Sequence, residues 1–237
     1  MKERPILFSG PMVRAILDGR KTQTRRIAVP KRSGIDFIGG GPMDGPDWND
    51  PTCWGFEAPN TGLWWALRGD EQCYQLPCPY GRPGDRMWVR ETHDVNRLGS
   101  ETFPDGRQRL YAGIAYQADD GRHEVDITDS QCRAIEAKKW RGWTPSIHMP
   151  RWASRITLEV TGVRVERLQD ISEVDAISEG IDKTAAGFWS TYGQCDVDGT
   201  YSPRLSYQCL WDSLNAARGF GWDANPWVWV VEFAKSV

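Results

Sequence analysis

The sequence predicts a mixed α+β fold, in which one small, closed or nearly closed β-barrel is surrounded by short helices. Predicted strands outnumber predicted helices and are interrupted by them, which is typical of α+β chains. A strand over residues 156–166 changes the parity of its apolar positions at Thr161 and Gly162, which indicates the bulge or bend of a curling sheet. Residues 31–80 are rich in Gly, Pro, Asp and Asn, so we expect an irregular, loop-rich insertion into a single domain over residues 1–237.

The composition limits the class of protein. With 237 residues, the chain is long enough to bury a sizeable core, as one large domain or two small ones. No apolar run approaches the roughly 20 residues of a membrane span, and the N-terminus lacks the apolar core of a signal peptide. We therefore expect a cytoplasmic protein with no membrane contact, whose six cysteines are thiols or ligands rather than a disulfide framework.

Basic residues are unevenly distributed, although the net charge is −3. Residues 1–32 contain nine Lys or Arg against two acids, and residues 133–155 contain six against Glu136 alone. Two basic patches on an acidic chain suit a phosphate-bearing partner held at one site, whereas ordinary solvated surface is the alternative, above all for the second patch. Some of the thirteen tryptophans are candidates for stacking on bases.

The first functional pattern spans residues 9–27. Ser9 as a cap and Pro11 in the first turn predict a short helix, and Gly19 ends it because a left-handed residue there costs glycine little. Residues 22–27 then alternate as a strand does, with polar and basic side chains on both faces. Core strands are not built from such residues, so this strand is predicted to face a partner.

A carboxylate is predicted inside the core at the next clear strand. Within the insertion only residues 62–67 resemble a strand, but residues 86–92 alternate strongly, with Met87 and Val89 inward. Glu91 points inward with them. A buried carboxylate is costly unless it is paired or used, so Glu91 is predicted either to pair with an arginine or to act in catalysis.

The remaining elements alternate strands with helices. We expect strands near residues 109–116 and 124–128, helices over 129–139, 172–179 and 207–217, and an almost wholly apolar, central strand over 227–233. Ser172 and Asp175 form a capping box for the second of these helices, which ends at Gly180. The predicted apolar faces consist of Val174, Ala176 and Ile177 on that helix and of Leu210, Trp211 and Leu214 on the last one.

The spacing Gly19-x-Lys21-x-x-Thr24-x-Arg26 after a short helix resembles the ASCH family, relatives of the PUA RNA-binding fold. Four further blocks are similar to the long ASCH-domain proteins of bacteriophages and prophages: PGDRMWVRE (83–91), RWASR (151–155), ISEVDAISEG (171–180) and NPWVWVVEF (225–233). The resemblance covers the chain apart from residues 31–80. It implies a PUA-like barrel and, for a phage-encoded protein, the cytoplasm of a bacterial host cell.

The resemblance also implies a function. The family is expected to bind RNA or a modified nucleobase or nucleoside in a cleft, and no cofactor is expected. Some small members are amidohydrolases that remove the acetyl group from N4-acetylcytidine, and others are reported as ribonucleases. Their working lysine, threonine and glutamate correspond by motif position to Lys21, Thr24 and Glu179, with Glu91 or Glu173 as substitutes for the glutamate. This chain is much longer than those small enzymes, which bears on access to the cleft.

Amide hydrolysis needs a nucleophile, a base and stabilisation of the oxyanion. Thr24 is the candidate nucleophile, and Lys21, with a pKa lowered by neighbouring arginines, is either its base or the cation that holds the oxyanion. A glutamate is the candidate general base for water. On a regular strand Lys21 and Thr24 point to opposite faces, so they converge only if Lys21 still lies in the turn after Gly19. The predicted binding residues are Arg20, Arg25, Arg26, Arg90, His148, Arg151 and Arg155.

Two other functions stay open. In a non-catalytic binding module, Lys21, Arg25 and Arg26 hold phosphates and Thr24 donates a hydrogen bond. In a ribonuclease, His148 is the candidate proton donor, although a lone histidine is more often structural. For either function, and for the hydrolase, the predicted partner is RNA or a modified nucleobase or nucleoside, and a monomer is favoured.

A zinc site is a weaker hypothesis. Cys53, Cys73 and Cys78 with His93 supply four possible ligands. Their spacing is at the loose edge of structural zinc patterns, and no second paired motif accompanies them. Scattered cysteines are more often small buried residues, so we expect no metal.

Overall fold

The structure, a computed structural model, describes residues 1–35, 37–39, 63–68, 72–137, 142–195, 197 and 199–236. The chain forms two compact units, and each is assembled from separate segments. Unit 1 comprises Met1–Asp18, Arg86–Leu158 and Lys235–Val237, and unit 2 comprises Gly19–Asp85 and Glu159–Ala234. One domain over residues 1–237 stays a prediction, because compactness does not decide whether a unit folds by itself.

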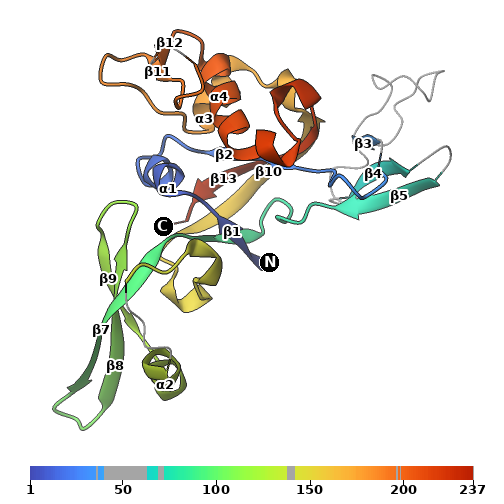
Figure 1. Ribbon diagram of the computed structural model, residues 1–237. Helices are drawn as coiled ribbons and strands as arrows, with labels where there is room; N and C mark the ends of the chain where they lie inside the picture. Colours follow the sequence, from blue (N-terminus) through green and yellow to red (C-terminus); the bar gives the residue numbers. More distant parts are fainter. Residues whose placement is uncertain are drawn as a thin grey trace. The chain divides into compact units, whose positions relative to one another are not determined.

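Unit 1 is built from two groups of strands and short helices (Figure 1). Its elements are β1 (Glu3–Leu7), α1 (Gly10–Leu17), β6 (Arg86–Arg90), β7 (His93–Thr102), β8 (Gln108–Tyr116), β9 (Arg122–Asp126), α2 (Asp129–Ala137), η2 (Ser146–His148) and η3 (Arg151–Ala153). Strand β1 pairs in parallel with β6, whereas β7, β8 and β9 form an antiparallel sheet in that order. Val95, Ala112 and Ile135 form part of one buried cluster between this sheet and α2.

Unit 2 contains the strand of the basic motif and two helices that pack on its sheet. Its elements are β2 (Gln23–Ile27), β3 (Phe37–Gly39), β4 (Leu63–Arg68), β5 (Gln72–Pro77), η4 (Leu168–Asp170), α3 (Glu173–Ser178), β11 (Trp189–Ser190), β12 (Gly199–Thr200), α4 (Pro203–Asn215), η5 (Ala216–Arg218), η6 (Trp222–Ala224) and β13 (Trp227–Lys235). A further strand, β10 (Thr157–Arg167), begins in unit 1 and continues in unit 2. In unit 2 the strand order is β10-β13-β2, with β13 antiparallel to β2.

The core of unit 2 lies where α3 and α4 meet β13. Val228 and Val230 of β13 belong to one buried cluster with Ala176 of α3 and with Tyr207 and Trp211 of α4. Burying a large apolar side chain of this kind stabilises a fold by about 1.5–3 kcal/mol. A strand flanked on both sides and buried on its faces is expected to be apolar throughout, so the predicted central strand over residues 227–233 is confirmed.

The predicted fold class is confirmed in its coarser form. The chain is a mixed α+β protein with more strands than helices. Each sheet of the described residues has two edge strands, so the closed barrel is not confirmed. A side chain at Gly162 in β10 would meet Glu232, since a Cβ there would lie 2.6 Å from the Glu232 Oε2 atom. The contact is with the flexible end of the Glu232 side chain, which could move aside, so it does not by itself require glycine at the predicted bend.

The insertion contains more regular structure than the sequence predicts. Residues 62–67 were expected to be its only strand, and they correspond to β4. In the structure β4 pairs antiparallel with both β3 and β5 and forms a three-stranded sheet. The two outer strands lack the sustained alternation of apolar residues that reveals a strand, so only the central one could be recognised.

The predicted apolar faces of α3 and α4 are partly wrong. Ala176 is buried, but Val174 is 73% exposed and Ile177 is also exposed. On α4, Trp211 is buried while Leu214 is exposed, and the buried face instead includes Tyr207 and other residues nearer the start of the helix. Helix α3 spans six residues, which is too short for its period to define a face. Helix α4 begins at Pro203, earlier than predicted, so its buried face was assigned from an incomplete segment.

Candidate functional site

The candidate site is built where β2 begins and α3 ends. Gly19 has a left-handed backbone conformation, with φ at +72°, and so allows a sharp turn before the strand. Lys21 follows as a bridge residue opposite Glu179, and the Thr22 N–H donates to the Ser178 carbonyl at 2.9 Å. Backbone pairing therefore holds the end of α3 against the start of β2.

Lys21 and Glu179 form a buried ion pair. The Lys21 Nζ donates at 2.8 Å to the Glu179 Oε2 atom and at 2.8 Å to the Glu179 carbonyl oxygen. The Lys21 side chain is 0% exposed and that of Glu179 is 5% exposed. Burial lowers the pKa of Lys21 below its ordinary value, while the charge of Glu179 acts in the opposite direction. An amine that releases its proton more readily than a surface lysine thus lies beside an acceptor oxygen.

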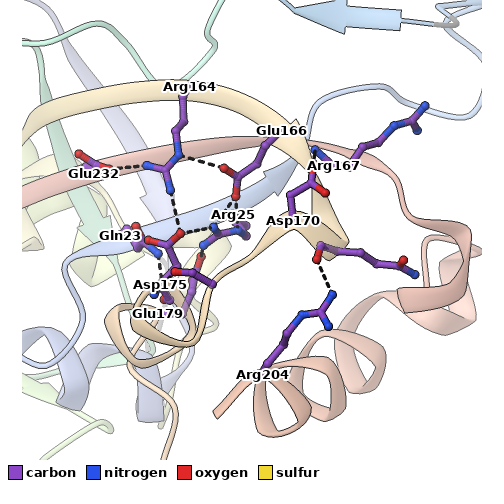
Figure 2. A network of polar contacts seen from close by, with 12 residues as sticks. Gln23, Arg25, Arg164, Glu166, Arg167, Asp170, Asp175, Glu179, Arg204 and Glu232 are labelled. Atoms are coloured by element: carbon purple, nitrogen blue, oxygen red, sulfur yellow. Dashed lines mark hydrogen bonds and ion pairs between the residues drawn. The ribbon is translucent and has the colours of Figure 1, made fainter. Parts of the chain in front are cut away.

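Arg25 joins the same carboxylate to two others (Figure 2). Its Nη1 atom lies 3.3 Å from the Glu179 Oε1, its Nη2 3.2 Å from the Asp175 Oδ2, and its Nε 3.1 Å from the Glu166 Oε1. The guanidinium carbon lies 5.9 Å from the ring centre of Tyr207. Burial raises the pKa of Tyr207 well above its ordinary value, so this phenol stays neutral.

Arg164 of β10 extends the cluster on its more open side (Figure 2). Its Nε donates to the Glu166 Oε2 at 3.0 Å and its Nη2 to the Asp175 Oδ2 at 3.2 Å, and it also pairs with Glu232. Although burial acts to raise the pKa of Asp175, the charges of Arg25 and Arg164 hold that pKa below its ordinary value. Asp175 is therefore an ionised link between two strands.

The ion-paired cluster has no surplus of positive charge. Its members are the cations Lys21, Arg25 and Arg164 and the carboxylates Glu166, Asp175, Glu179 and Glu232. The formal charge of these seven groups is −1. Adding Arg26, whose charge acts on Lys21, brings the total only to zero. A phosphate would thus have to displace carboxylates, because Lys21 and Arg25, the two cations of the first basic patch in this cluster, are already paired within the protein.

The two faces of β2 are used differently. Gln23 lies on the face of Arg25, since its Nε2 donates to the Asp175 carbonyl at 2.9 Å. By alternation, Thr24 and Arg26 lie on the opposite face. Thr24 is 3% exposed and pairs with a residue of β13. Lys21 pairs with Glu179 on the face of Arg25, so Lys21 and Thr24 do not converge on one face as the predicted site required.

The two flanking arginines of the motif are less buried. Arg20 donates to the Ile181 carbonyl at 3.4 Å and lies 3.6 Å from the Asp182 carboxylate, with its side chain exposed. Arg26 is half-buried. Arg20 thus already has an acidic neighbour, which weakens it as a phosphate ligand.

Glu91 lies in a separate network within unit 1. Arg155 donates from Nε and Nη2 to the two carboxylate oxygens of Glu91, both at 2.9 Å, and also donates to Asp119. The Arg155 guanidinium carbon lies 4.0 Å from the ring centre of Tyr116, a cation–π contact. Both carboxylate oxygens of Glu91 thus accept hydrogen bonds from an arginine. This is the first of the two predictions for Glu91, pairing with an arginine.

Two other predicted binding residues, Arg90 and Arg151, lie beside the indole ring of Trp88 in unit 1. The guanidinium carbons of Arg90 and Arg151 lie 5.3 Å and 5.9 Å from the ring centre of Trp88. Arg90 donates to the Met149 carbonyl at 3.1 Å, and Arg151 pairs with the carboxylate of Glu3 at 2.9 Å. The remaining residue, His148, is exposed in η2.

The structure brings together some predicted site residues and separates others into different networks. Lys21, Arg25 and Glu179 share one ion-paired cluster. The possible substitutes for the glutamate do not: Glu91 belongs to the Arg155 network, and Glu173 is exposed at the start of α3. The cluster members that the sequence did not reveal are Arg164, Glu166, Asp175, Tyr207 and Glu232. The charged pair Arg-x-Glu within a half-buried strand was the one available signal for the first two.

The sequence predicts neither a metal site nor a membrane span. Among the described residues no group of three or more His, Cys, Asp or Glu could hold a metal ion. The zinc hypothesis depends on Cys53 and on the side chain of Cys73, which lie outside the described part; Cys78 is a buried thiol. Within the same residues, no helix is long and apolar enough to cross a bilayer.

Comparison with models of protein families, with curated proteins and with solved structures finds no match to this chain. The chemistry of the cluster must therefore be judged from its own groups. A carboxylate and an amine in contact can accept and donate a proton, whereas arginine stays protonated in proteins. Lys21 and Glu179 are the pair in the cluster that combines both capacities in a buried place.

Proposed function

We propose that the chain is an ASCH-type amidohydrolase that removes the acyl group from an N4-acylated cytidine, with Lys21 and Glu179 as its catalytic residues. The observation that carries the proposal is the buried contact of 2.8 Å between the Lys21 Nζ and the Glu179 Oε2. The proposal includes the PUA-like relationship of the fold and the cytoplasm of a bacterial host cell as its setting.

The contact between Lys21 and Glu179 supports the proposal because the sequence motifs that named the two residues did not require them to touch. The resemblance assigns a lysine from one motif and a glutamate from a weakly patterned helix 158 positions away. Of the three glutamates considered, Glu179 is the one that contacts Lys21, and Glu91 and Glu173 have other surroundings. A chance assignment would have no reason to select the glutamate that contacts the lysine.

Glu179 acts as the general base in the proposed reaction. Its carboxylate takes a proton from water, the water oxygen attacks the acyl carbonyl carbon, and the ammonium of Lys21 stabilises the resulting oxyanion. The proton then passes from Glu179 to the exocyclic nitrogen as the carbon–nitrogen bond breaks. The products are a carboxylic acid and cytidine. Thr24, the nucleophile that the resemblance implies, lies on the opposite face of β2 and takes no part in this reaction, so water is the nucleophile.

The charge of the cluster favours an uncharged substrate. Lys21 and Arg25 are both buried among carboxylates, and releasing either for a phosphate would leave the buried Glu179 with one cation instead of two. A nucleobase amide carries no charge and does not compete with these ion pairs. Because Lys21 and Glu179 are buried, the proposal requires that neighbouring residues move to admit the substrate.

A binding module for RNA is the second candidate, and a different observation favours it. In unit 1 the half-buried Trp88 has two guanidinium groups beside it, from Arg90 and Arg151. Aromatic rings with adjacent arginines are common stacking sites for single-stranded nucleic acids. In this function the cluster around Lys21 is a structural element. The exposed His148 would serve the ribonuclease variant of this function as proton donor.

The test is a turnover assay of the full chain against N4-acetylcytidine and other acylated and alkylated cytidines, with products identified by mass spectrometry. We expect acetate release from N4-acetylcytidine, lost in Lys21→Ala and retained in Thr24→Ala. Glu173→Gln is the matched control, because this exposed glutamate lies on the same helix as Glu179. No conversion of any nucleoside, together with salt-dependent binding of a short single-stranded RNA that is lost in Trp88→Ala, would favour the binding module.

A further inference from the structure

Unit 2 contains two thiols in contact that the proposed reaction does not use. Cys195 lies in the connection between β11 and β12, and Cys209 lies in α4. Their Sγ atoms are 3.7 Å apart. Cys195 is exposed, whereas Cys209 is buried. One thiol is therefore open to reagents in solution, and its neighbour is reached chiefly through it.

We propose that Cys195 and Cys209 form a thiol–disulfide exchange site, which low-molecular-weight disulfides such as oxidised glutathione convert reversibly into an intramolecular disulfide. The sulfurs must approach from 3.7 Å to about 2 Å. Cys195 and the two residues before it, Gly193 and Gln194, are exposed, so this part of the connection can supply the movement. The inference does not rest on the hydrolase function.

The exchange balances in two steps. The Cys195 thiolate attacks one sulfur of oxidised glutathione, and one glutathione thiolate leaves. The Cys209 thiolate then attacks the Cys195 sulfur of the mixed disulfide and displaces the second glutathione. Two protein thiols are oxidised, one glutathione disulfide is reduced to two thiols, and the two protein protons end on glutathione. Excess reduced glutathione reverses both steps.

The environment of Cys209 sets the pH dependence of the second step. Burial raises the pKa of Cys209 to about 11, and the Cys195 thiol acts in the same direction. Cys209 is therefore mostly protonated at neutral pH, and ring closure is expected to speed up about tenfold per pH unit below that pKa. The mixed disulfide on Cys195 is thus a populated intermediate near pH 7.

The disulfide would fix the connection between β11 and β12 onto the helix that supports the ion-paired cluster. Cys209 follows two residues after Tyr207, whose ring lies against Arg25. Closing a short loop restricts the unfolded chain. We expect the midpoint of thermal unfolding to rise on the order of 5–10 °C on oxidation and to return on reduction.

The experiment treats the reduced full chain with oxidised glutathione at pH 7 and at pH 8, followed by alkylation and peptide mass spectrometry. The expected product is a peptide pair linked through Cys195 and Cys209. Cys209→Ala should stop at glutathione bound to Cys195, and Cys195→Ser should leave Cys209 reduced. Cys132→Ala is the matched control, because Cys132 is a half-buried thiol in unit 1, and it should oxidise like wild type.

Three results would overturn the inference: both thiols still alkylated after oxidation, linkage to a different cysteine, or the same amount of mixed disulfide in wild type and Cys209→Ala after the reaction at pH 8 has reached its end point. Cys195→Ser replaces an exposed side chain and is expected to fold like wild type, which circular dichroism checks. It therefore keeps the test decisive even if Cys209→Ala is destabilised.

Discussion

Two buried carboxylates, one in each unit, have different partners and different chemical capacities. Glu179 in unit 2 accepts hydrogen bonds from a lysine and an arginine, whereas both oxygens of Glu91 in unit 1 are bound by Arg155. Burial lowers the pKa of Lys21. Burial also acts to lower the pKa of Arg155, but its hydrogen bonds to Glu91 and to a neighbouring aspartate raise that pKa above the ordinary value.

The comparison shows that burial of a carboxylate does not by itself indicate catalysis. An arginine paired through two parallel hydrogen bonds holds a carboxylate in place. Burial raises the pKa of Glu91, and the hydrogen bonds from Arg155 oppose that rise. A buried lysine can give up its proton, so a carboxylate beside it can take part in proton transfer. Glu91 therefore has the properties of a structural residue and Glu179 those of a catalytic one.

The largest expected effects come from removing the two arginines. Arg25→Met leaves three carboxylates near one another with only Lys21 and Arg164 to pair them, and should reduce the free energy of unfolding by about 3–5 kcal/mol. Arg155→Met leaves Glu91 unpaired and should fall at the lower end of that range, since Arg155 is less buried than Arg25. Urea denaturation measures both. If Arg25→Met lost no more free energy of unfolding than Arg155→Met, the larger stabilising role assigned to Arg25 would be contradicted.

A smaller effect is expected from the aspartates that pair with these arginines. Arg155 hydrogen bonds hold the pKa of Asp119 below its ordinary value, and the pKa of Asp175 is also lowered by its arginines although burial opposes this. A lowered folded-state pKa contributes stability that is present above about pH 4 and is lost as pH falls through the folded-state value.

Replacing either aspartate by asparagine should therefore flatten the loss of stability below about pH 4. At pH 7, Asp175→Asn should cost about 1–2 kcal/mol, and Asp119→Asn should cost less because its carboxylate is more exposed to solvent. Urea denaturation at a series of pH values provides the measurement. Unchanged acid sensitivity in both variants would mean that other carboxylates control it.

The smallest effect is expected at Val174, which the sequence predicts to lie on the buried face of α3. The side chain is 73% exposed, so Val174→Ser should change the free energy of unfolding by less than about 0.5 kcal/mol. Ala176→Ser is the matched comparison, because Ala176 is fully buried on the same helix and its hydroxyl would need a partner. If Val174→Ser lost more free energy of unfolding than Ala176→Ser, Val174 would lie on the buried face of α3, as the sequence predicts.

Local signals in the sequence predicted some element ends, although the hydroxyl of Ser9, the predicted cap of α1, accepts no capping hydrogen bond. Ser172 was predicted to cap α3, and its hydroxyl accepts the Asp175 N–H at 3.0 Å. Gly19 was predicted to end the first helix, and it has the left-handed conformation that this requires. Both depend on interactions between neighbours in the chain, which spacing alone reveals.

Long-range polar contacts were not predictable in the same way. The Asp175 carboxylate pairs with Arg25, 150 positions away in the sequence, and nothing around either residue indicates the other. The resemblance gave Lys21 and Glu179 as candidates, and their contact depends on how α3 lies against β2. Apolar periodicity defines strands, but which charged side chains meet depends on tertiary packing.

The most direct test of the difference between the two carboxylates compares Glu179→Gln with Glu91→Gln. Acetate release from N4-acetylcytidine is measured for each variant and for wild type, with folding checked by circular dichroism. The account predicts a loss of about 10²–10⁴-fold in Glu179→Gln, because the general base is removed, and a rate within about tenfold of wild type in folded Glu91→Gln. Equal losses in both variants, or no release by the wild-type protein, would contradict it.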